Sequence, residues 1–154
     1  MTPAVDQLKH HDVAFRLHDY VHDPSSPAYG AEAAQKLGVS EERVFKTLVV
    51  ALSDKSLAVG VLPVATQLNL KAMAKASGSK KATMADPALV QRVTGYVLGG
   101  VSPFGQKKPL PTILADRSAN FETIFVSGGR RGLEIEVAPE DLLRVLNGRC
   151  APIT

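Results

Sequence analysis

Two apolar runs joined by a short polar turn constrain the fold of this chain most strongly. Residues Thr47–Leu52 and Leu57–Val61 are almost entirely apolar, and the turn between them reads Ser-Asp-Lys-Ser. Short runs of this kind, separated by turn-forming residues, predict a β-hairpin whose strands are mostly buried. The chain is therefore expected to fold around a sheet.

Capping residues and amphipathic stretches predict several helices around this hairpin. They are expected at Pro3–His10, Gly30–Leu37, Leu70–Ser77, Pro87–Thr94 and Pro139–Leu146, with a short helical turn at Ser40–Glu42. Further strands are expected at Phe15–Asp19, Tyr96–Leu98, Thr112–Ala115, Thr123–Val126 and Leu133–Val137, and a loop at His22–Tyr29. Helices and strands mix without regular alternation. This favours one α+β domain over residues 1–154, with a mixed, mostly antiparallel sheet or a partly closed barrel flanked by helices.

Composition and cysteine content limit the class of protein. A chain of 154 residues with 45% hydrophobic and 21% charged residues can bury a core without disulfides or structural metal. Cys150 is the single cysteine, so no internal disulfide is possible and a reducing cytoplasm is expected. The sequence shows no export signal, and no apolar run approaches the roughly 20 residues of a membrane-spanning helix.

Basic residues are concentrated in the middle and later parts of the chain. The net charge is only +3, yet residues 71–81 contain four lysines and no acidic residue. This asymmetry suits a polyanion bound on one face, although solvated lysines on helix surfaces are the alternative interpretation. The residues that such a polyanion would contact are Lys71, Lys75, Lys80, Lys81, Lys107, Lys108, Arg130 and Arg131.

Glycines gather in two segments, Gly99–Gly105 and Ser127–Gly132. Glycine lets a ligand approach the backbone closely, and Pro103 stiffens the first segment, so its N–H groups could face an oxyanion or a phosphate. A plain turn between strands is the alternative. Neither segment has the spacing of a dinucleotide fingerprint or of a P-loop, which disfavours nucleotide hydrolysis.

The sequence offers no obvious nucleophile or metal site. His18 and His22 have the spacing of zinc ligands on a helix, but they fall where a strand runs into a loop, so exposed or packing histidines are expected. Cys150 stands apart from the histidines, and no serine lies in a Gly-x-Ser-x-Gly elbow. An enzyme built from this chain must work without a familiar protein nucleophile.

Two charged positions stand beside predicted core strands. Lys46 lies between Phe45 and the first apolar run, so its ammonium group must reach solvent or face a polar cavity. Glu134 and Glu136 alternate with apolar residues in Leu133–Val137, which places both carboxylates on one face of a strand. A solvated sheet face is the expectation there.

In several stretches the chain resembles the YbaK/EbsC family of free-standing bacterial aminoacyl-tRNA editing proteins, and its cysteine-specific deacylases in particular. The stretches occur in order over nearly the whole length. They are Met1–Val5, His18–Tyr20, His22–Pro24, Val44–Leu48, Ala85–Pro87, Thr94–Tyr96, Gly99–Pro103, Gly105–Lys108, Leu110–Ile113, Val126–Gly129 and Arg131–Leu133.

The resemblance implies a mixed α/β domain related to the editing insertion of bacterial prolyl-tRNA synthetase, in the cytoplasm and without metal or organic cofactor. It implies cysteine esterified to proline tRNA, Cys-tRNA(Pro), as the substrate, with Cys-tRNA(Cys) as a further one and prolyl-tRNA synthetase as a partner. It also implies that the substrate's own thiol attacks the ester, forms a thiolactone and releases the tRNA. That mechanism fits the missing nucleophile.

The same resemblance implies roles for particular residues. It makes Lys46, Gly99 and Tyr20 catalytic. The substrate-binding residues that it implies are Thr47, Gly100, Ser102, Pro103, Ser127 and Glu134. The chain departs from the family at Glu134, where aspartate is usual, so the acid is one methylene longer. Two alternatives stay open: an alanine- or serine-directed editing hydrolase that uses water, and a non-catalytic module that binds tRNA or synthetase.

Overall fold

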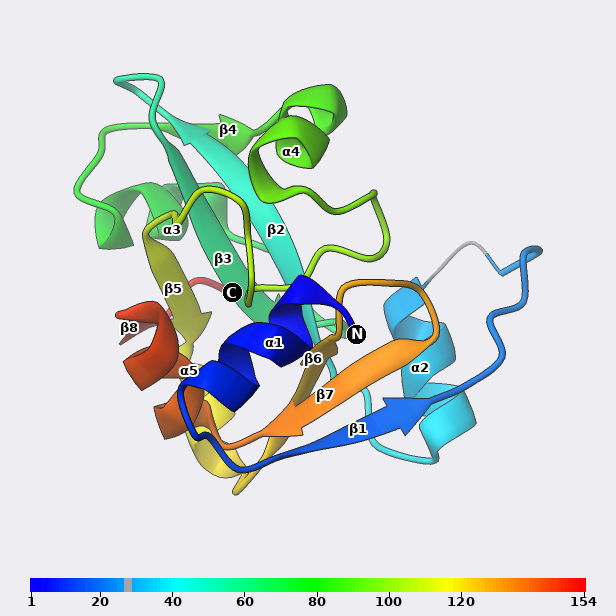
Figure 1. Cartoon of the computed structure of the whole chain (residues 1–154). Helices are drawn as coiled ribbons and strands as arrows, with labels where there is room; N and C mark the ends of the chain where they lie inside the picture. Colours follow the sequence, from blue (N-terminus) through cyan, green and yellow to red (C-terminus); the bar gives the residue numbers. More distant parts are fainter. Residues whose placement is uncertain (27–28) are drawn as a thin grey trace.

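The computed structural model describes residues 1–26 and 29–154, whose strands form two sheets (Figure 1). The three-stranded sheet has the order β1-β7-β6 and is antiparallel; its strands are β1 (Phe15–Asp19), β6 (Ile124–Ser127) and β7 (Leu133–Val137). The five-stranded sheet has the order β4-β2-β3-β5-β8; its strands are β2 (Phe45–Leu52), β3 (Leu57–Pro63), β4 (Ala82–Met84), β5 (Thr112–Ala115) and β8 (Arg149–Ala151).

The predicted hairpin is confirmed at the centre of the larger sheet. Strands β2 and β3 pair antiparallel, and β5 and β8 continue the sheet in parallel. A single bridge between Val44 and Phe125 connects the start of β2 to β6 in the other sheet. Within the described residues the strands do not close into a barrel, so of the two expected arrangements the mixed, mostly antiparallel sheet is the one observed.

The helices begin and end where the sequence predicts them, within a residue. They are α1 (Pro3–His10), α2 (Tyr29–Leu37), α3 (Leu70–Ala76), α4 (Pro87–Thr94) and α5 (Pro139–Leu146). The side chains of Thr2, Asn69 and Asp86 each accept a hydrogen bond from a backbone N–H in the first turn. At the other end, Gly95 and Asn147 adopt the left-handed conformation that stops α4 and α5.

The strand predicted at Tyr96–Leu98 is wrong. Tyr96 is buried and its hydroxyl donates to the Phe104 carbonyl at 2.6 Å, while Val97 and Leu98 are exposed. The apolar pattern of this segment is explained by the burial of the Tyr96 side chain and not by pairing with a neighbouring strand. The residues of Ser40–Glu42, expected as a helical turn, form an ordinary turn in which Arg43 N–H donates to Ser40 O at 3.0 Å.

Three elements escaped prediction because they are short. Strands β4 and β8 have three residues each and carry mostly exposed side chains, so they lack an alternating apolar pattern. A 3₁₀ helix, Asp116–Asn120, follows β5 directly. The loop expected at His22–Tyr29 falls partly outside the described residues, since 27 and 28 are not described, and Tyr29 already begins α2.

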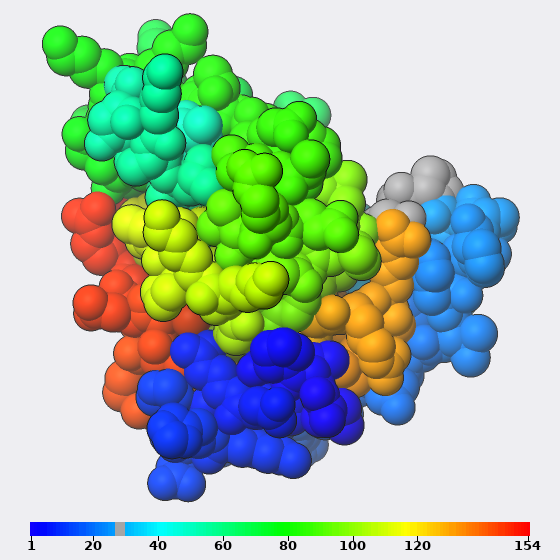
Figure 2. Space-filling model, turned by 45° about the horizontal axis from the view of Figure 1, so that its top comes forward, coloured from blue at the N-terminus to red at the C-terminus, as the bar shows by residue number. Residues whose placement is uncertain are grey.

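Helix α1 belongs to the main core and supports two loops. Its Val5 and Leu8 are fully buried in the core that both sheets share. The Gln7 side chain accepts from Gly105 N–H at 2.7 Å, and the Thr2 hydroxyl donates to Gly128 O at 2.5 Å. In Figure 2 this helix, in dark blue, lies against the yellow-green and the orange segments that contain those glycines. None of the helices in the described ranges is long and apolar enough to cross a membrane.

Candidate active site

A cavity of about 270 Å³ opens where the two sheets meet. This volume lies just below the range of roughly 300–1,000 Å³ that is typical of small-molecule sites. Its wall combines residues from β2, β4, β6 and β7, from α2 and α4, and from the segments that follow β1, β3, β4, β6 and α4. The residues that line it are Tyr20, Gly30, Val44, Phe45, Lys46, Thr47, Leu48, Val49, Val64, Met84, Ala85, Val90, Leu98, Gly99, Val101, Ser127, Arg130, Arg131 and Glu134.

Lys46 supplies a partly buried cation to this cavity. Its ammonium group donates to the Thr66 carbonyl at 2.6 Å, and burial lowers the pKa of the group from its ordinary value. The neighbouring Thr47 also lines the cavity, and its buried hydroxyl has no hydrogen-bond partner among the described residues. A buried hydroxyl without a partner is costly unless a ligand or water satisfies it. Strand β2 therefore lines the cavity with a charged residue and, next in sequence, a residue whose hydroxyl is unused.

Glu134 is buried in the cavity wall, so the predicted solvated face of β7 is wrong at this position. Glu134 is 7% exposed, and burial raises the pKa of its carboxyl group to about 8. The reason is topological: β7 is the central strand of its sheet, and the Val44–Phe125 bridge brings the start of β2 close to this sheet. Glu136 is also partly covered, because it accepts from Thr123 at 2.6 Å and contacts His18 at 2.8 Å.

Tyr20 enters the cavity from the end of β1. Burial raises the pKa of its phenol to about 12, and the carboxylates of Glu134 and Glu32 add to the shift. Its backbone N–H donates to Gly132 O at 2.9 Å, which fixes the residue against the β6–β7 turn. The phenol therefore stays protonated at neutral pH and is able to donate a hydrogen bond.

The glycine-rich loop after α4 contributes to the cavity only through its first part. Gly99 lines the cavity and has a φ of 86°, which favours glycine. The Gly100 N–H donates to Val97 O at 2.9 Å within the loop. Ser102 and Pro103 are buried and do not line the cavity. The Ser102 hydroxyl accepts a hydrogen bond from the Phe104 N–H at 3.2 Å, so it stabilises the conformation of the loop.

The predicted polyanion-binding residues fall into separate groups. Arg130 and Arg131 line the cavity, and Ser127 lies beside them and accepts from Gly129 N–H at 3.1 Å. Lys107 and Lys108 lie at the end of α4, where their backbone N–H groups donate to carbonyls of its last turn. The remaining four lysines are exposed on α3 or just before β4 and do not line the cavity: Lys71, Lys75, Lys80 and Lys81.

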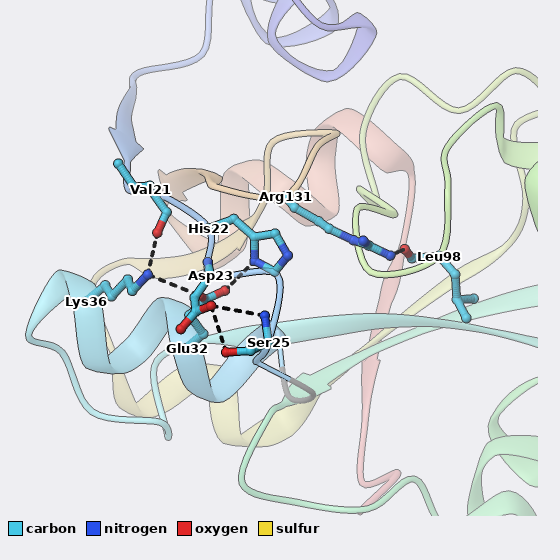
Figure 3. Close-up of polar contacts among 8 residues, drawn as sticks. All are labelled: Val21, His22, Asp23, Ser25, Glu32, Lys36, Leu98 and Arg131. Atoms are coloured by element: carbon cyan, nitrogen blue, oxygen red, sulfur yellow. Dashed lines mark hydrogen bonds and ion pairs between the residues drawn. The ribbon is translucent and has the colours of Figure 1, made fainter.

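A polar network on α2 holds the segment that follows Tyr20 (Figure 3). The buried carboxylate of Glu32 contacts the His22 ring at 2.7 Å, the Asp23 N–H at 2.7 Å and the Lys36 ammonium at 3.1 Å. Burial alone would raise the pKa of Glu32, but these three partners lower it to about 2. The sequence did not single out this network. His22 contacts Glu32, whereas His18 contacts Glu136, so the two histidines interact with different carboxylates.

Three basic residues, a carboxyl group, a phenol and two hydroxyl-bearing residues line the cavity. Among its described lining residues there is no cysteine or histidine, and the exposed Cys150 does not line it. No group of three or more histidine, cysteine, aspartate or glutamate side chains with metal-site geometry occurs in the described residues. The site can bind a polar ligand, orient it and move a proton.

The chain belongs to the aminoacyl-tRNA editing domain family, whose model matches residues 24–145. This membership agrees with the family resemblance of the sequence stretches and places the cavity in an editing domain.

Relatives and solved structures agree with this assignment. The chain is 40% identical, over 99% of its length and 93% of the relative's, to an Enterococcus faecalis protein described as "Putative Cys-tRNA(Pro)/Cys-tRNA(Cys) deacylase EbsC". It is 30% identical to the "Uncharacterized protein YwhH" of Bacillus subtilis, over 82% of this chain and 80% of that one. A structure described as "a putative trans-editing enzyme for prolyl tRNA synthetase" shares the fold, with a TM-score of 0.83, 22% identity and coverage of 100% and 98%.

Proposed function

We propose that this protein is a trans-acting editing deacylase that removes cysteine from mischarged proline tRNA, Cys-tRNA(Pro), in the cytoplasm, with Cys-tRNA(Cys) as a second substrate. Prolyl-tRNA synthetase would be its partner in clearing the mischarged product. The observation that carries the proposal is the cavity wall, which includes Lys46, Glu134 and Tyr20 but lacks a cysteine or histidine among its described residues. Family membership and the Enterococcus relative support the same class of substrate.

The substrate itself would supply the nucleophile. The cysteine sulfur attacks the ester carbonyl carbon, a C–S bond forms, and the C–O bond to the tRNA ribose breaks. The thiol proton ends on the released ribose hydroxyl, and the amino acid leaves as a thiolactone. Attack within one molecule reaches effective concentrations of roughly 10⁵–10⁸ M when the groups are well placed, so the protein mainly has to hold the reactive conformer.

The residues of the cavity suit this task. Glu134, with a pKa raised to about 8, can take the thiol proton when ionised and return it to the leaving oxygen. Lys46 would provide positive charge for the terminal nucleotide, and the loop at Gly99, which lines the cavity, would offer a backbone N–H group to the developing oxyanion. Tyr20 can donate to the ester or the ribose, and Thr47 has an unused hydroxyl for the same ligand.

Binding of the tRNA would extend from the cavity over the basic residues nearby. Arg130 lines the cavity, while Lys107 and Lys108 are exposed at the end of α4. The lysines of α3 and of residues 80–81 would meet phosphates further along the acceptor stem. Contacts of this kind add affinity without sequence selectivity, and they weaken as salt rises.

A deacylation panel on one proline tRNA tests the proposal. With cysteine, serine and alanine charged on the same tRNA, we expect cysteine to be released at least about 100-fold faster, because only it carries a thiol for internal attack. The Lys46→Ala variant should lose most of this activity with an unchanged circular dichroism spectrum. Lys9→Ala, which removes an exposed lysine on α1, is the matched control.

Each other outcome of the panel excludes the proposal. Equal rates for serine or alanine would indicate a water-using editor of the same family. Tight tRNA binding without release of any of the three amino acids above the uncatalysed rate would indicate a non-catalytic binding module.

A further inference from the structure

Exposed apolar side chains gather at the mouth of the cavity. Five large apolar residues of the described chain are mostly exposed, and two of them, Met84 at 50% and Leu98 at 57%, also line the cavity. They come from different segments, since Met84 ends β4 and Leu98 lies in the loop after α4. Exposed apolar surface at a cavity whose wall also carries basic side chains marks a place where a ligand covers it.

The structure holds the backbone of both residues in place. Met84 pairs with Val50 at the edge of the five-stranded sheet. The Arg131 guanidinium donates to the Leu98 carbonyl at 2.9 Å, which ties this loop to the β6–β7 turn (Figure 3). A Cβ on Gly100 would lie 3.1 Å from the Cα of Arg130, so the loop and the turn are in close contact there. Met84 and Leu98, the apolar rim of the cavity, therefore lie on backbone segments that are anchored to their neighbours.

Positive charge adjoins this rim. Arg130 lines the same cavity and is exposed, and Arg131 lies next to it with its guanidinium engaged by the loop. Arginine suits phosphate because its planar group can donate two parallel hydrogen bonds. An apolar surface next to an arginine matches the two parts of a nucleotide, a flat base and a phosphate.

We propose that Met84 and Leu98 form a nucleobase-binding subsite, which holds the terminal base of the tRNA acceptor strand while Arg130 contacts the adjacent phosphate. The inference rests on the proposed function, because it takes the aminoacyl ester to occupy the cavity. The terminal base is one ribose away from that ester, so it must lie at the mouth. Arg131 is then a positioning residue that acts through the Leu98 carbonyl.

The test uses two uncharged RNA trinucleotides that differ only in the last base. One is cytidine-cytidine-adenosine, and the other has an abasic ribose at its 3′ end. We expect the wild-type protein to bind the complete trinucleotide about five- to tenfold more tightly, as expected for burying one face of a base. The double variant Met84→Ser/Leu98→Ser should bind both trinucleotides equally. Because both side chains are exposed, its thermal stability should match that of the wild type.

Val97 supplies the matched control. It is 51% exposed and precedes Leu98 in the same loop, but it does not line the cavity. Val97→Ser should therefore keep the preference for the complete trinucleotide. The subsite is excluded if the double variant keeps that preference, or if the double variant loses only its affinity for prolyl-tRNA synthetase, which would make the rim a protein-docking surface.

The outcome is separable from that of the proposed function. Uncharged trinucleotides cannot be deacylated, so their binding reports the subsite alone. Base-dependent binding together with inactivity on Cys-tRNA(Pro) would contradict the proposed function and leave the subsite standing. Normal deacylation together with base-independent binding would overturn the subsite alone.

Discussion

The carboxyl group of Glu134 is buried in the wall of the cavity. Burial raises its pKa from 4.5 to about 8, so the folded protein keeps it protonated over a range where the unfolded chain has released the proton. The unfolded state thus binds fewer protons between about pH 4.5 and 8, and stability must fall as the pH rises through this window. Above about pH 8 the loss is complete.

Replacing Glu134 with glutamine tests this pKa directly. Glu134→Gln keeps the shape of the side chain but removes the ionisation, so its free energy of unfolding should decline less between pH 4.5 and 8 than that of the wild type. The difference should reach at most about 1.4 kcal/mol per pH unit. Urea unfolding at several pH values measures it. Parallel pH profiles for both proteins would show that Glu134 ionises as freely when folded as when unfolded.

At the scale of elements, α1 and the two glycine-rich loops form one support behind the cavity. A Cβ on Gly105, where φ is 66°, would lie 2.3 Å from the backbone of Pro3, so the loop after Gly99 closes onto α1 with no space for a side chain. On the other side, Thr2 donates to Gly128 in the β6–β7 turn. Through these contacts the N-terminal segment connects the loop after α4 to the β6–β7 turn.

Gly105→Ala should therefore cost stability and activity together. Gly38→Ala is the matched control, because Gly38 has a similar φ of 69° with no atom within 4 Å of the added Cβ. We expect the control to lose about 1 kcal/mol from backbone strain alone, and Gly105→Ala to lose at least about 2 kcal/mol more through the clash. Equal losses in urea unfolding would mean that α1 moves aside freely, and it would then not support the loop.

The sequence predicts elements well where the local signal is strong and fails where a distant segment decides. Helix caps and the hairpin follow from neighbouring residues, so α1 and the β2–β3 pair appear as expected. Strand β8 lies near the C-terminus, pairs with β5 and carries mostly exposed side chains, so no local sequence pattern predicts it. The burial of Glu134 likewise depends on the start of β2 approaching the β1-β7-β6 sheet, which alternation along one strand does not reveal.

At the scale of the whole molecule, the elements that build the core extend beyond the part that the family model matches. That match begins at residue 24, yet α1 and β1 precede it. Val5 and Leu8 are fully buried in the main core, and β1 pairs along its whole length with β7. We therefore propose one domain over residues 1–154, in which the N-terminal segment delivers Tyr20 to the cavity.

The site as a whole was only partly predictable. The resemblance of sequence stretches named Lys46, Gly99 and Tyr20, and the fold brings them to one cavity. Met84 and Leu98 carry no chemical signature in the sequence. They become notable only when the structure shows large apolar side chains exposed beside a cation.

The most direct test of the account replaces the substrate's thiol and leaves the protein unchanged. Proline tRNA charged with 2-aminobutyrate carries a methyl group where cysteine carries sulfur, so it should fill the cavity equally well but be unable to attack its own ester. We expect it to bind like Cys-tRNA(Pro) and to be released at the uncatalysed rate. Turnover of the 2-aminobutyryl ester as fast as that of the cysteinyl ester would show that the protein uses water or a group of its own, and it would contradict the mechanism.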